Sequence, residues 1–335
     1  MDQLRIGLIG AGRISAAHAK SIDELPELTL QRVCDPVVEN AERLAALYGG
    51  TVSSDPADVL GAGDVDAVII ASPTPTHVDL LNTAIAAGLP TLCEKPIDLD
   101  LARVDSLRAA AAAASAPVVL GFNRRFDPHF AGLHRRVTAG DIGRLEQLAI
   151  TSRDPAPAPR AYIESSGGIF RDMTIHDFDM ARFFVPDIVE VTARGANQFS
   201  DDIRELGDFD AVVVVLSGAD GEQITITNSR RAVYGYDQRL EAFGSDGLLT
   251  VGNITDTAVR HWSGTAVESL EPYQNFFLER YADAYRLELQ EFAKAARGEP
   301  NRAPGFEDGR SALVLADAAE ESARTGRTVR VSTND

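Results

Sequence analysis

The segment LRIGLIGAGRIS, residues 4–15, joins a short apolar run to a glycine-rich turn and the start of a helix pattern. Gly10 and Gly12 take the first two glycine positions of the pattern G-x-G-x-x-G, and Ser15 takes the third. The first glycine allows a tight turn and the second lets backbone approach a pyrophosphate. The third position governs the packing of helix on strand, where a small serine suffices. The segment therefore predicts a phosphate site at a helix N-terminus.

Outward from this turn, apolar runs alternate with helix patterns as far as about Phe122. The predicted strands lie within LRIGLI, LQRVCD, DAVIIAS, PTLCEK and PVVLGF, and segments such as residues 38–47 and 76–87 carry the helix pattern between them. This alternation is typical of a parallel α/β sheet. We therefore predict a doubly wound Rossmann domain over residues 1–122.

Asp35 stands at the end of the second predicted strand. An acid roughly 20 residues after the glycine pattern holds the ribose hydroxyls of a bound dinucleotide. The same acid repels a 2′-phosphate, and the residues that follow it are Pro36 and Val37 rather than arginine. The sequence therefore predicts NAD, not NADP, as the cofactor.

Two further segments follow predicted strands, ASPTPTHVDL at residues 71–80 and CEKP at residues 93–96. Open α/β sheets bind ligands at the carboxyl ends of their strands, so both segments are candidates for the cofactor cleft. The ammonium of Lys95 could hold a substrate hydroxyl there and stabilise an alkoxide. The predicted cofactor contacts are Gly10, Gly12, Arg13, Ile14, Asp35, Ser72, Pro73, Thr74, His77, Glu94, Lys95 and Arg124.

Composition narrows the class of partner. The formal net charge of the 335 residues is −18, which argues against nucleic acid and anionic membranes and favours small molecules. Cys34 and Cys93 lie in apolar runs, so we expect buried thiols in a reducing compartment rather than a disulfide or zinc site. No cleavable leader or membrane span is evident, and we expect a cytoplasmic protein.

The segment GGIFRDMTIHDFDMARFF, residues 167–184, has the apolar face of a buried helix but carries many charged side chains. One interpretation is a solvated helix face, since acids and arginines are mostly exposed. The other is an active site, because Asp172 and His176 are spaced i and i+4 and share one helix face.

Taken together, GLIGAGRIS, EKP at 94–96, GFNRRFDP at 121–128 and GGIFRDMTIHDFD resemble the oxidoreductase family that includes glucose-fructose oxidoreductase and inositol dehydrogenase. ITSRDPAP at 150–157 and NSRRAVYGYDQR at 228–239 are most similar to its bacterial inositol 2-dehydrogenase branch. The resemblance implies a second, α+β domain over residues 123–335, built on a large open and mainly antiparallel sheet. Strand-like runs at 210–216 and 223–227 agree with it.

The resemblance also implies roles for particular residues. Lys95, Asp172 and His176 would be catalytic and would contact the substrate, with further substrate contacts from Arg153, Asp154 and Tyr236. Asp177 and Asp179 need no catalytic role and are interpreted as capping, packing or solvated residues. Hydride transfer to NAD requires no metal, and none is predicted.

The implied activity is NAD-dependent oxidation of a secondary hydroxyl of a cyclic polyol, first of all myo-inositol to 2-keto-myo-inositol (scyllo-inosose). One alternative is a dehydrogenase of another inositol isomer, an aldose or an anhydrosugar. An alternative of another class is an NAD-binding sensor without catalysis, which the intact Lys95, Asp172 and His176 disfavour. The family's exposed sheet face implies a homotetramer.

Overall fold

The computed structural model describes residues 3–332 and divides into two compact units. Unit 1 runs to Phe126 and also takes in Ala282–Leu313; unit 2 comprises Asp127–Tyr281 and the chain from Val314 onward. The sequence predicts one boundary at residues 122/123, whereas the chain passes between the units three times. An amphipathic helix can pack on any apolar core, so its periodicity does not reveal which unit it joins.

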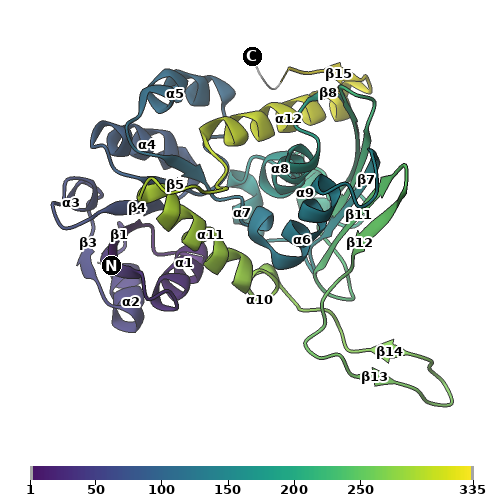
Figure 1. Cartoon of the computed structure of the whole chain (residues 1–335), viewed down its shortest axis with the longest axis horizontal. Coiled ribbons are helices and arrows are strands. Elements are labelled where there is room, and N and C mark those ends of the chain that lie inside the picture. Colours follow the sequence, from purple (N-terminus) through teal and green to yellow (C-terminus); the bar gives the residue numbers. More distant parts are fainter. Residues whose placement is uncertain (1–2, 333–335) are drawn as a thin grey trace. The chain divides into compact units, whose positions relative to one another are not determined.

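Unit 1 is built on a six-stranded parallel sheet in the order β3-β2-β1-β4-β5-β6 (Figure 1). The strands are β1 (Leu4–Ile9), β2 (Leu28–Cys34), β3 (Thr51–Ser53), β4 (Ala67–Ile70), β5 (Thr91–Cys93) and β6 (Val118–Leu120). This order reverses between β1 and β4, as in a Rossmann domain, and confirms the predicted fold. All four residues of β4 are buried, which explains its unbroken apolar run.

The helices of unit 1 include one that sequence patterns did not assign to it. They are α1 (Arg13–Asp23), α2 (Val38–Tyr48), α3 (Ala57–Leu60), η1 (Thr74–Thr76), α4 (His77–Ala86), α5 (Leu101–Ala113), η2 (Asn123–Phe126), α11 (Ala282–Ala296) and the first part of α12 (Phe306–Thr325). Helix α11 packs beside α1. Its Leu289 and Phe292 join Ile6, Leu8 and Ile69 in one apolar core. Burial of each such side chain stabilises the fold by about 1.5–3 kcal/mol.

Unit 2 contains a seven-stranded sheet in the order β12-β11-β7-β10-β9-β8-β15. The strands are β7 (Leu145–Arg153), β8 (Ile188–Ala196), β9 (Ala211–Gly218), β10 (Gln223–Ser229), β11 (Asp237–Gly244), β12 (Gly247–Val251) and β15 (Val329–Arg330). Only β7 and β10 pair in parallel, and the other neighbours are antiparallel. The structure thus confirms the predicted open, mainly antiparallel sheet.

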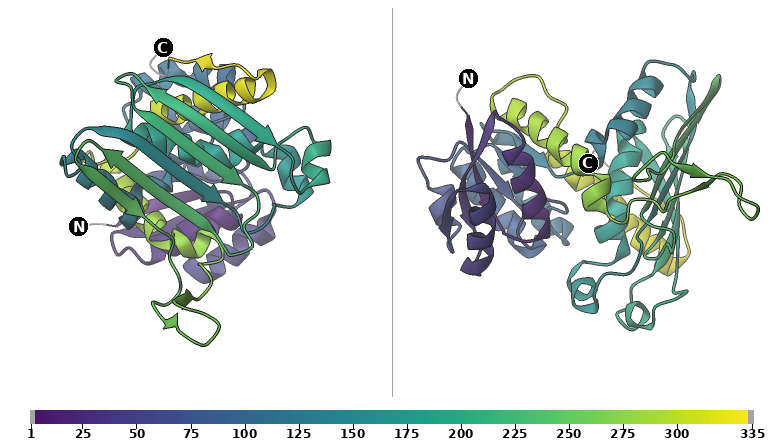
Figure 2. Two further views of the ribbon diagram at one scale, coloured as in Figure 1. Left: turned by 90° about the vertical axis from the view of Figure 1, so that its right-hand side faces the viewer. Right: turned by 90° about the horizontal axis from the view of Figure 1, so that it is seen from below.

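Helices cover one face of this sheet and leave the other open (Figure 2). They are α6 (Pro128–Thr138), α7 (Arg160–Ser165), η3 (Phe170–Thr174), α8 (Ile175–Phe184), α9 (Asp201–Glu205), α10 (Phe277–Arg280) and the rest of α12. Side chains alternate accordingly: Val214 and Leu216 are fully buried, while Val213 and Val215 are exposed. No helix in the described part of the chain is long and apolar enough to cross a membrane.

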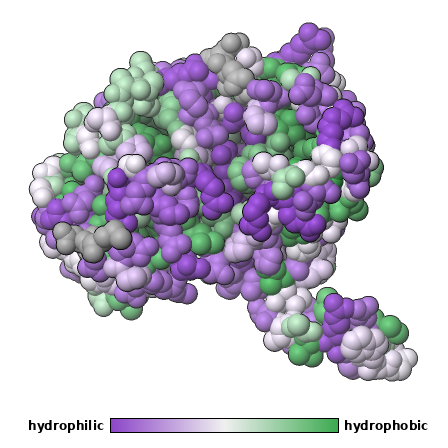
Figure 3. All heavy atoms as spheres, viewed as in Figure 1, coloured by the Kyte–Doolittle hydropathy of each residue, from purple (hydrophilic) through white to green (hydrophobic). Residues whose placement is uncertain are grey.

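A hairpin of β13 (Arg260–His261) and β14 (Ser269–Leu270) extends from unit 2 (Figure 1). Trp262 and Val267 on it are exposed, and apolar and polar patches alternate along it in Figure 3.

A buried ion pair lies beside two of the points where the chain passes between units. Asp127 follows the end of unit 1, and Arg280 precedes the return at Ala282. The two side chains are 1% and 2% exposed and are hydrogen bonded to each other. Asp127 also caps α6 by accepting hydrogen bonds from the N–H groups of His129 and Phe130. One carboxylate thus fixes the start of α6 and the end of α10.

Both cysteines are buried free thiols, at the ends of β2 and β5. Burial and the charge of Asp35 raise the pKa of the Cys34 thiol to about 11. Burial raises the pKa of the Cys93 thiol well above its ordinary value. Both thiols therefore stay protonated and unreactive at neutral pH.

The two glycines of the β1–α1 turn should respond differently to a methyl group. Gly10 has φ +98°, and a Cβ there would lie 2.5 Å from the carbonyl oxygen of Ala71, whereas a Cβ at Gly12 meets no heavy atom within 4 Å. We expect Gly10→Ala to lower the unfolding midpoint of the cofactor-free protein by roughly 5–15 °C. Gly12→Ala should lower it by about 3 °C or less. Differential scanning calorimetry of both variants tests this, and equal losses would contradict it.

Candidate active site

The β1–α1 turn offers an open helix N-terminus. Gly12 is the N-cap of α1, no side chain caps it, and the first turn, which begins with Arg13 and Ile14, contains no acid. Its N–H groups and the helix dipole therefore favour an anion such as a pyrophosphate. Ser15, in place of the third glycine, is fully buried with its Oγ 3.5 Å from the carbonyl oxygen of Ala71. A small side chain fits at this contact between α1 and the end of β4.

Asp35 lies next to this turn. The N–H of Ala11 donates to its Oδ2 at 2.8 Å, and the N–H of Val37 donates to Oδ1 at 2.9 Å. Asn40 Nδ2 donates to the same Oδ1 at 3.3 Å. These bonds fix the half-buried carboxylate between the end of β2 and the glycine turn. A dinucleotide with its pyrophosphate at α1 would bring its ribose to this acid.

The predicted cofactor loops follow β4 and β5 in unit 1. Ser72 and Pro73 lie between β4 and η1, and Thr74 begins η1. Glu94, Lys95 and Pro96 follow β5, and the Lys95–Pro96 peptide bond is cis. Because β4 and β5 are parallel neighbours, both loops leave the same edge of the sheet as the β1–α1 turn. Among the predicted contacts, His77, Glu94 and Arg124 are buried in this unit.

In unit 2, Asp172 and His176 lie where the helix changes type. Phe170–Thr174 forms a π-helical turn, and the α-helix α8 begins at Ile175. The sequence predicts one helix throughout, because the i and i+4 pattern does not separate the two geometries. Single π-helical turns inside helices occur frequently at functional sites.

Asp172 is held by two side chains that sequence analysis assigned no role. Arg230 Nη1 donates to its Oδ2 at 2.9 Å, and the hydroxyl of Tyr162 donates to its Oδ1 at 2.7 Å. Arg230 is 1% exposed and also donates to Asp208 at 3.3 Å. Burial by itself lowers the pKa of Arg230, but Asp172 and Asp208 outweigh it and raise the pKa above its ordinary value. The available signal was an arginine directly after a strand of alternating apolar and polar residues.

Other polar residues on this helix are buried rather than solvated. Asp177 is fully buried and accepts hydrogen bonds from Ser152 Oγ at 2.6 Å and Asn228 Nδ2 at 2.7 Å. Thr174 donates to Asn228 at 2.7 Å, and Asp179 is 1% exposed. Asp177 thus ties α8 to strands β7 and β10, which corresponds to the packing role among those expected.

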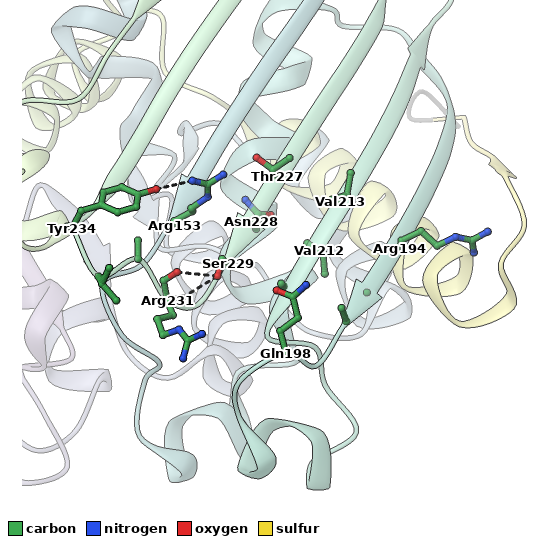
Figure 4. Close-up of a pocket in the computed structure, with 15 residues that line it drawn as sticks. Arg153, Arg194, Gln198, Val212, Val213, Thr227, Asn228, Ser229, Arg231 and Tyr234 are labelled. Carbon is green, nitrogen blue, oxygen red and sulfur yellow. Dashed lines mark hydrogen bonds between the residues drawn. The ribbon is translucent and has the colours of Figure 1, made fainter.

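The three further predicted substrate contacts, Arg153, Asp154 and Tyr236, lie in different surroundings. Arg153 donates to Tyr234 at 2.6 Å and to Asp237 at 3.2 Å, and lines a surface pocket of about 620 Å³ (Figure 4). Because Ser152 points to Asp177 in α8, strand alternation directs Arg153 to the opposite sheet face. The structure therefore does not bring Arg153 together with Asp172 and His176.

Tyr236 and Asp154 differ from Arg153. Tyr236 is 5% exposed and packs edge-on against Tyr281 and Phe276. The charge of Asp154 contributes to the raised pKa of Arg230, which associates Asp154 with the Asp172 pair. Among residues 3–332, no group of three or more His, Cys, Asp and Glu side chains is arranged to hold a metal ion.

Comparison with known proteins identifies both parts of the chain. Residues 4–122 match the model described as the oxidoreductase family, NAD-binding Rossmann fold. Residues 130–250 match the GFO/IDH/MocA C-terminal domain. The inositol 2-dehydrogenase of Rhizobium meliloti (strain 1021) is 43% identical over 330 residues, which cover 98% of this chain and 99% of that protein.

Solved structures agree over the same length. A myo-inositol dehydrogenase from Corynebacterium glutamicum ATCC 13032 has a TM-score of 0.96 at 54% identity, covering 98% of this chain and 99% of that chain. A scyllo-inositol dehydrogenase from Lactobacillus casei with bound cofactor NAD(H) and scyllo-inositol has a TM-score of 0.90 at 28% identity, covering 98% and 99%. With both of its domains matched, this chain belongs to the GFO/IDH/MocA oxidoreductase family and is an NAD-dependent dehydrogenase.

Proposed function

We propose that the protein oxidises a secondary hydroxyl of a cyclic polyol, with myo-inositol converted to 2-keto-myo-inositol (scyllo-inosose) as its main reaction. The observation that carries this proposal is the likeness to inositol 2-dehydrogenases over nearly the whole chain, at 43% and 42% identity. The candidate residues Lys95, Asp172 and His176 are all present, which favours an enzyme over an NAD-binding sensor.

The residues of unit 1 fit NAD. The α1 N-terminus has no capping side chain or acid, and the space beyond Gly12 is open. Asp35 provides a carboxylate for the ribose hydroxyls, held by the N–H groups of Ala11 and Val37. Bound NAD supplies the acceptor for the hydride that leaves the carbinol carbon.

The chain's own residues handle the hydroxyl proton. Oxidation breaks the C–H and O–H bonds of the alcohol, and its proton needs an acceptor. We assign that role to the imidazole of His176, while the ammonium of Lys95 stabilises the developing alkoxide. Asp172 would orient the substrate or the imidazole from a carboxylate that Arg230 and Tyr162 hold in place. Asp154 and Tyr236 are further proposed contacts that rest on the resemblance, and the N–H of Asp154 donates to the carbonyl oxygen of Ser229, the neighbour of Arg230. Arg153 lies on the opposite sheet face and is not proposed as a contact.

A second candidate is another inositol isomer, since the similar Lactobacillus casei enzyme carries scyllo-inositol in its name and complex. An aldose or an anhydrosugar is a further alternative within the family. We also propose a homotetramer, supported by exposed apolar residues on the open sheet face of unit 2, such as Val213, Val215 and Phe243. A cytoplasmic location is supported by the two buried free thiols and the use of NAD.

Substrate preference tests the proposed function directly. We expect myo-inositol with NAD to be oxidised faster than sorbitol, because a rigid ring presents its hydroxyls without the entropy cost of ordering a flexible chain. NADH absorbance across a panel of cyclitols, aldoses and anhydrosugars measures this. Efficient turnover of an aldose together with inactivity toward every inositol isomer would replace the main proposal with its alternative.

The base can be identified through pH dependence. We expect His176→Ala to lower the hydride-transfer rate by roughly 10²- to 10⁴-fold and to leave NAD binding nearly unchanged. In the parent enzyme the rate should rise with pH, because only the neutral imidazole accepts a proton. Single-turnover NADH formation measures both effects. His261→Ala, at an exposed histidine of the hairpin, is the control, and a parental pH profile in His176→Ala would remove His176 from the mechanism.

Cofactor selectivity depends on Asp35. A 2′-phosphate would come close to this carboxylate, so Asp35→Ser should reduce the NAD-over-NADP ratio of kcat/KM by roughly 10- to 100-fold. Glu39→Gln removes an exposed acid of the neighbouring helix α2 and controls for the overall change in charge. Steady-state kinetics with both cofactors provides the measurement, and an unchanged ratio in Asp35→Ser would show that selectivity arises elsewhere.

A further inference from the structure

We propose that His18 and His77 are positioning residues that hold the segment Glu94–Lys95–Pro96 from both sides. The proposal rests on the role assigned to Lys95 in the proposed function. It concerns contacts within unit 1 only, and sequence analysis gave neither histidine such a task.

His77 connects two strand-end loops. It is the first residue of α4 and is 1% exposed. Its Nδ1 lies 2.8 Å from the carbonyl oxygen of Pro96, and its Nε2 lies 2.8 Å from the carbonyl oxygen of Ser72. A carbonyl oxygen can only accept, so each contact needs an N–H on the ring, and both contacts are hydrogen bonds at the same time only when both ring nitrogens carry a proton. One ring therefore joins the loop after β4 to the residue that follows Lys95.

His18 holds the other side of the segment. It lies in α1, is fully buried, and places Nε2 2.8 Å from Glu94 Oε1. The ring of Tyr285 packs edge-on against it, with ring centroids 5.6 Å apart. Gly121 leaves room for this carboxylate, because a Cβ there would lie 2.9 Å from Glu94 Oε2. The residue that precedes Lys95 is thus tied to the helix that begins at the glycine turn.

The two contacts act on one short segment from two different helices. Helix α1 begins at Gly12, and α4 follows the Ser72 loop, so both carry predicted cofactor contacts at their N-terminal ends. Burying a polar ring costs free energy that an apolar side chain of similar size would avoid. We therefore explain the two buried histidines by the position that they impose on the residues on either side of Lys95. A displacement of about 1 Å at a reacting group can cost roughly 10²-fold in rate.

Asparagine and glutamine can separate the two contacts of His77. The amide nitrogen of asparagine takes the place of Nδ1 and that of glutamine the place of Nε2. His77→Gln keeps the Ser72 contact and loses the Pro96 contact, so we expect kcat to fall by roughly 10- to 100-fold with little change in KM for NAD. His77→Asn keeps the Pro96 contact, and we expect a higher KM for NAD with a smaller loss of kcat.

The same substitutions at His18 test the Glu94 contact. His18→Gln retains an N–H at the Nε2 position and should keep most of the parental kcat, whereas His18→Asn should lose roughly 10-fold or more. His261→Gln, at an exposed position of unit 2, is the control for a histidine substitution as such. Calorimetry of each variant separates loss of folded protein from loss of rate.

Hydrogen exchange tests the proposal independently of any substrate. In His77→Gln and His18→Asn, the non-proline amides of residues 94–98 should exchange roughly 10-fold faster or more. In His77→Asn the increase should fall on the amides of Ser72, Thr74 and Thr76. These results would support the two contacts even if the parent enzyme did not oxidise inositols. Inactivity toward inositols would overturn only the proposed function. If the variants lose stability equally, with parental kcat, KM and exchange in both segments, the histidines are merely structural and the proposal fails.

Discussion

The site in unit 1 depends on the lack of space for a side chain at Gly10. Its backbone passes so close to Ala71 and Ser72 that only glycine fits, and its φ of +98° suits glycine alone. That close passage lets α1 begin directly above the end of β1. It also brings the N–H of Ala11 to Asp35, and thereby joins the helix N-terminus and the carboxylate that we propose for the pyrophosphate and the ribose. The β4 and β5 loops leave the same edge, so the nucleotide site and Lys95 share one rigid foundation.

The candidate site of unit 2 depends on a different constraint, because it contains buried charged side chains. Asp172 and Arg230 are separated by 57 intervening residues in the sequence but form an ion pair in which Arg230 is nearly fully buried, with Asp208 as a second acid. Removing either partner of such a pair would leave an uncompensated charge, so the network restricts where Asp172 can lie. Asp177 is likewise fixed by Ser152 and Asn228 on strands β7 and β10, so these two acids are not part of a solvated face.

Sequence reasoning succeeded where the signal was local. The glycine turn and the alternation of strands with helices are set by short-range sterics and hydrogen bonding, so five of the six Rossmann strands could be predicted. The three-residue strand β3 was missed because it is too short to show a pattern. It did not reveal that α11 joins unit 1, because an amphipathic helix does not specify its partner. Nor could it show the face on which Arg153 lies, since strand alternation gives relative but not absolute orientation. Arg230 was missed because it is distant from its partner Asp172 in the sequence. Tyr162 is nearer to Asp172, but no sequence pattern indicates that the two side chains meet.

In both units, buried side chains hold a group that we propose to meet the substrate. Lys95 follows a short strand in a loop, and a loop alone would leave its ammonium loosely placed. Buried side chains from α1 and α4 contact the residues on either side of it, as Arg230 contacts Asp172 in unit 2. Lys95 and Asp172 are only partly buried, whereas His18, His77 and Arg230 are nearly or fully buried. Burial excludes competing water from the supporting hydrogen bonds, so the geometry of the reactive group is fixed before any ligand arrives.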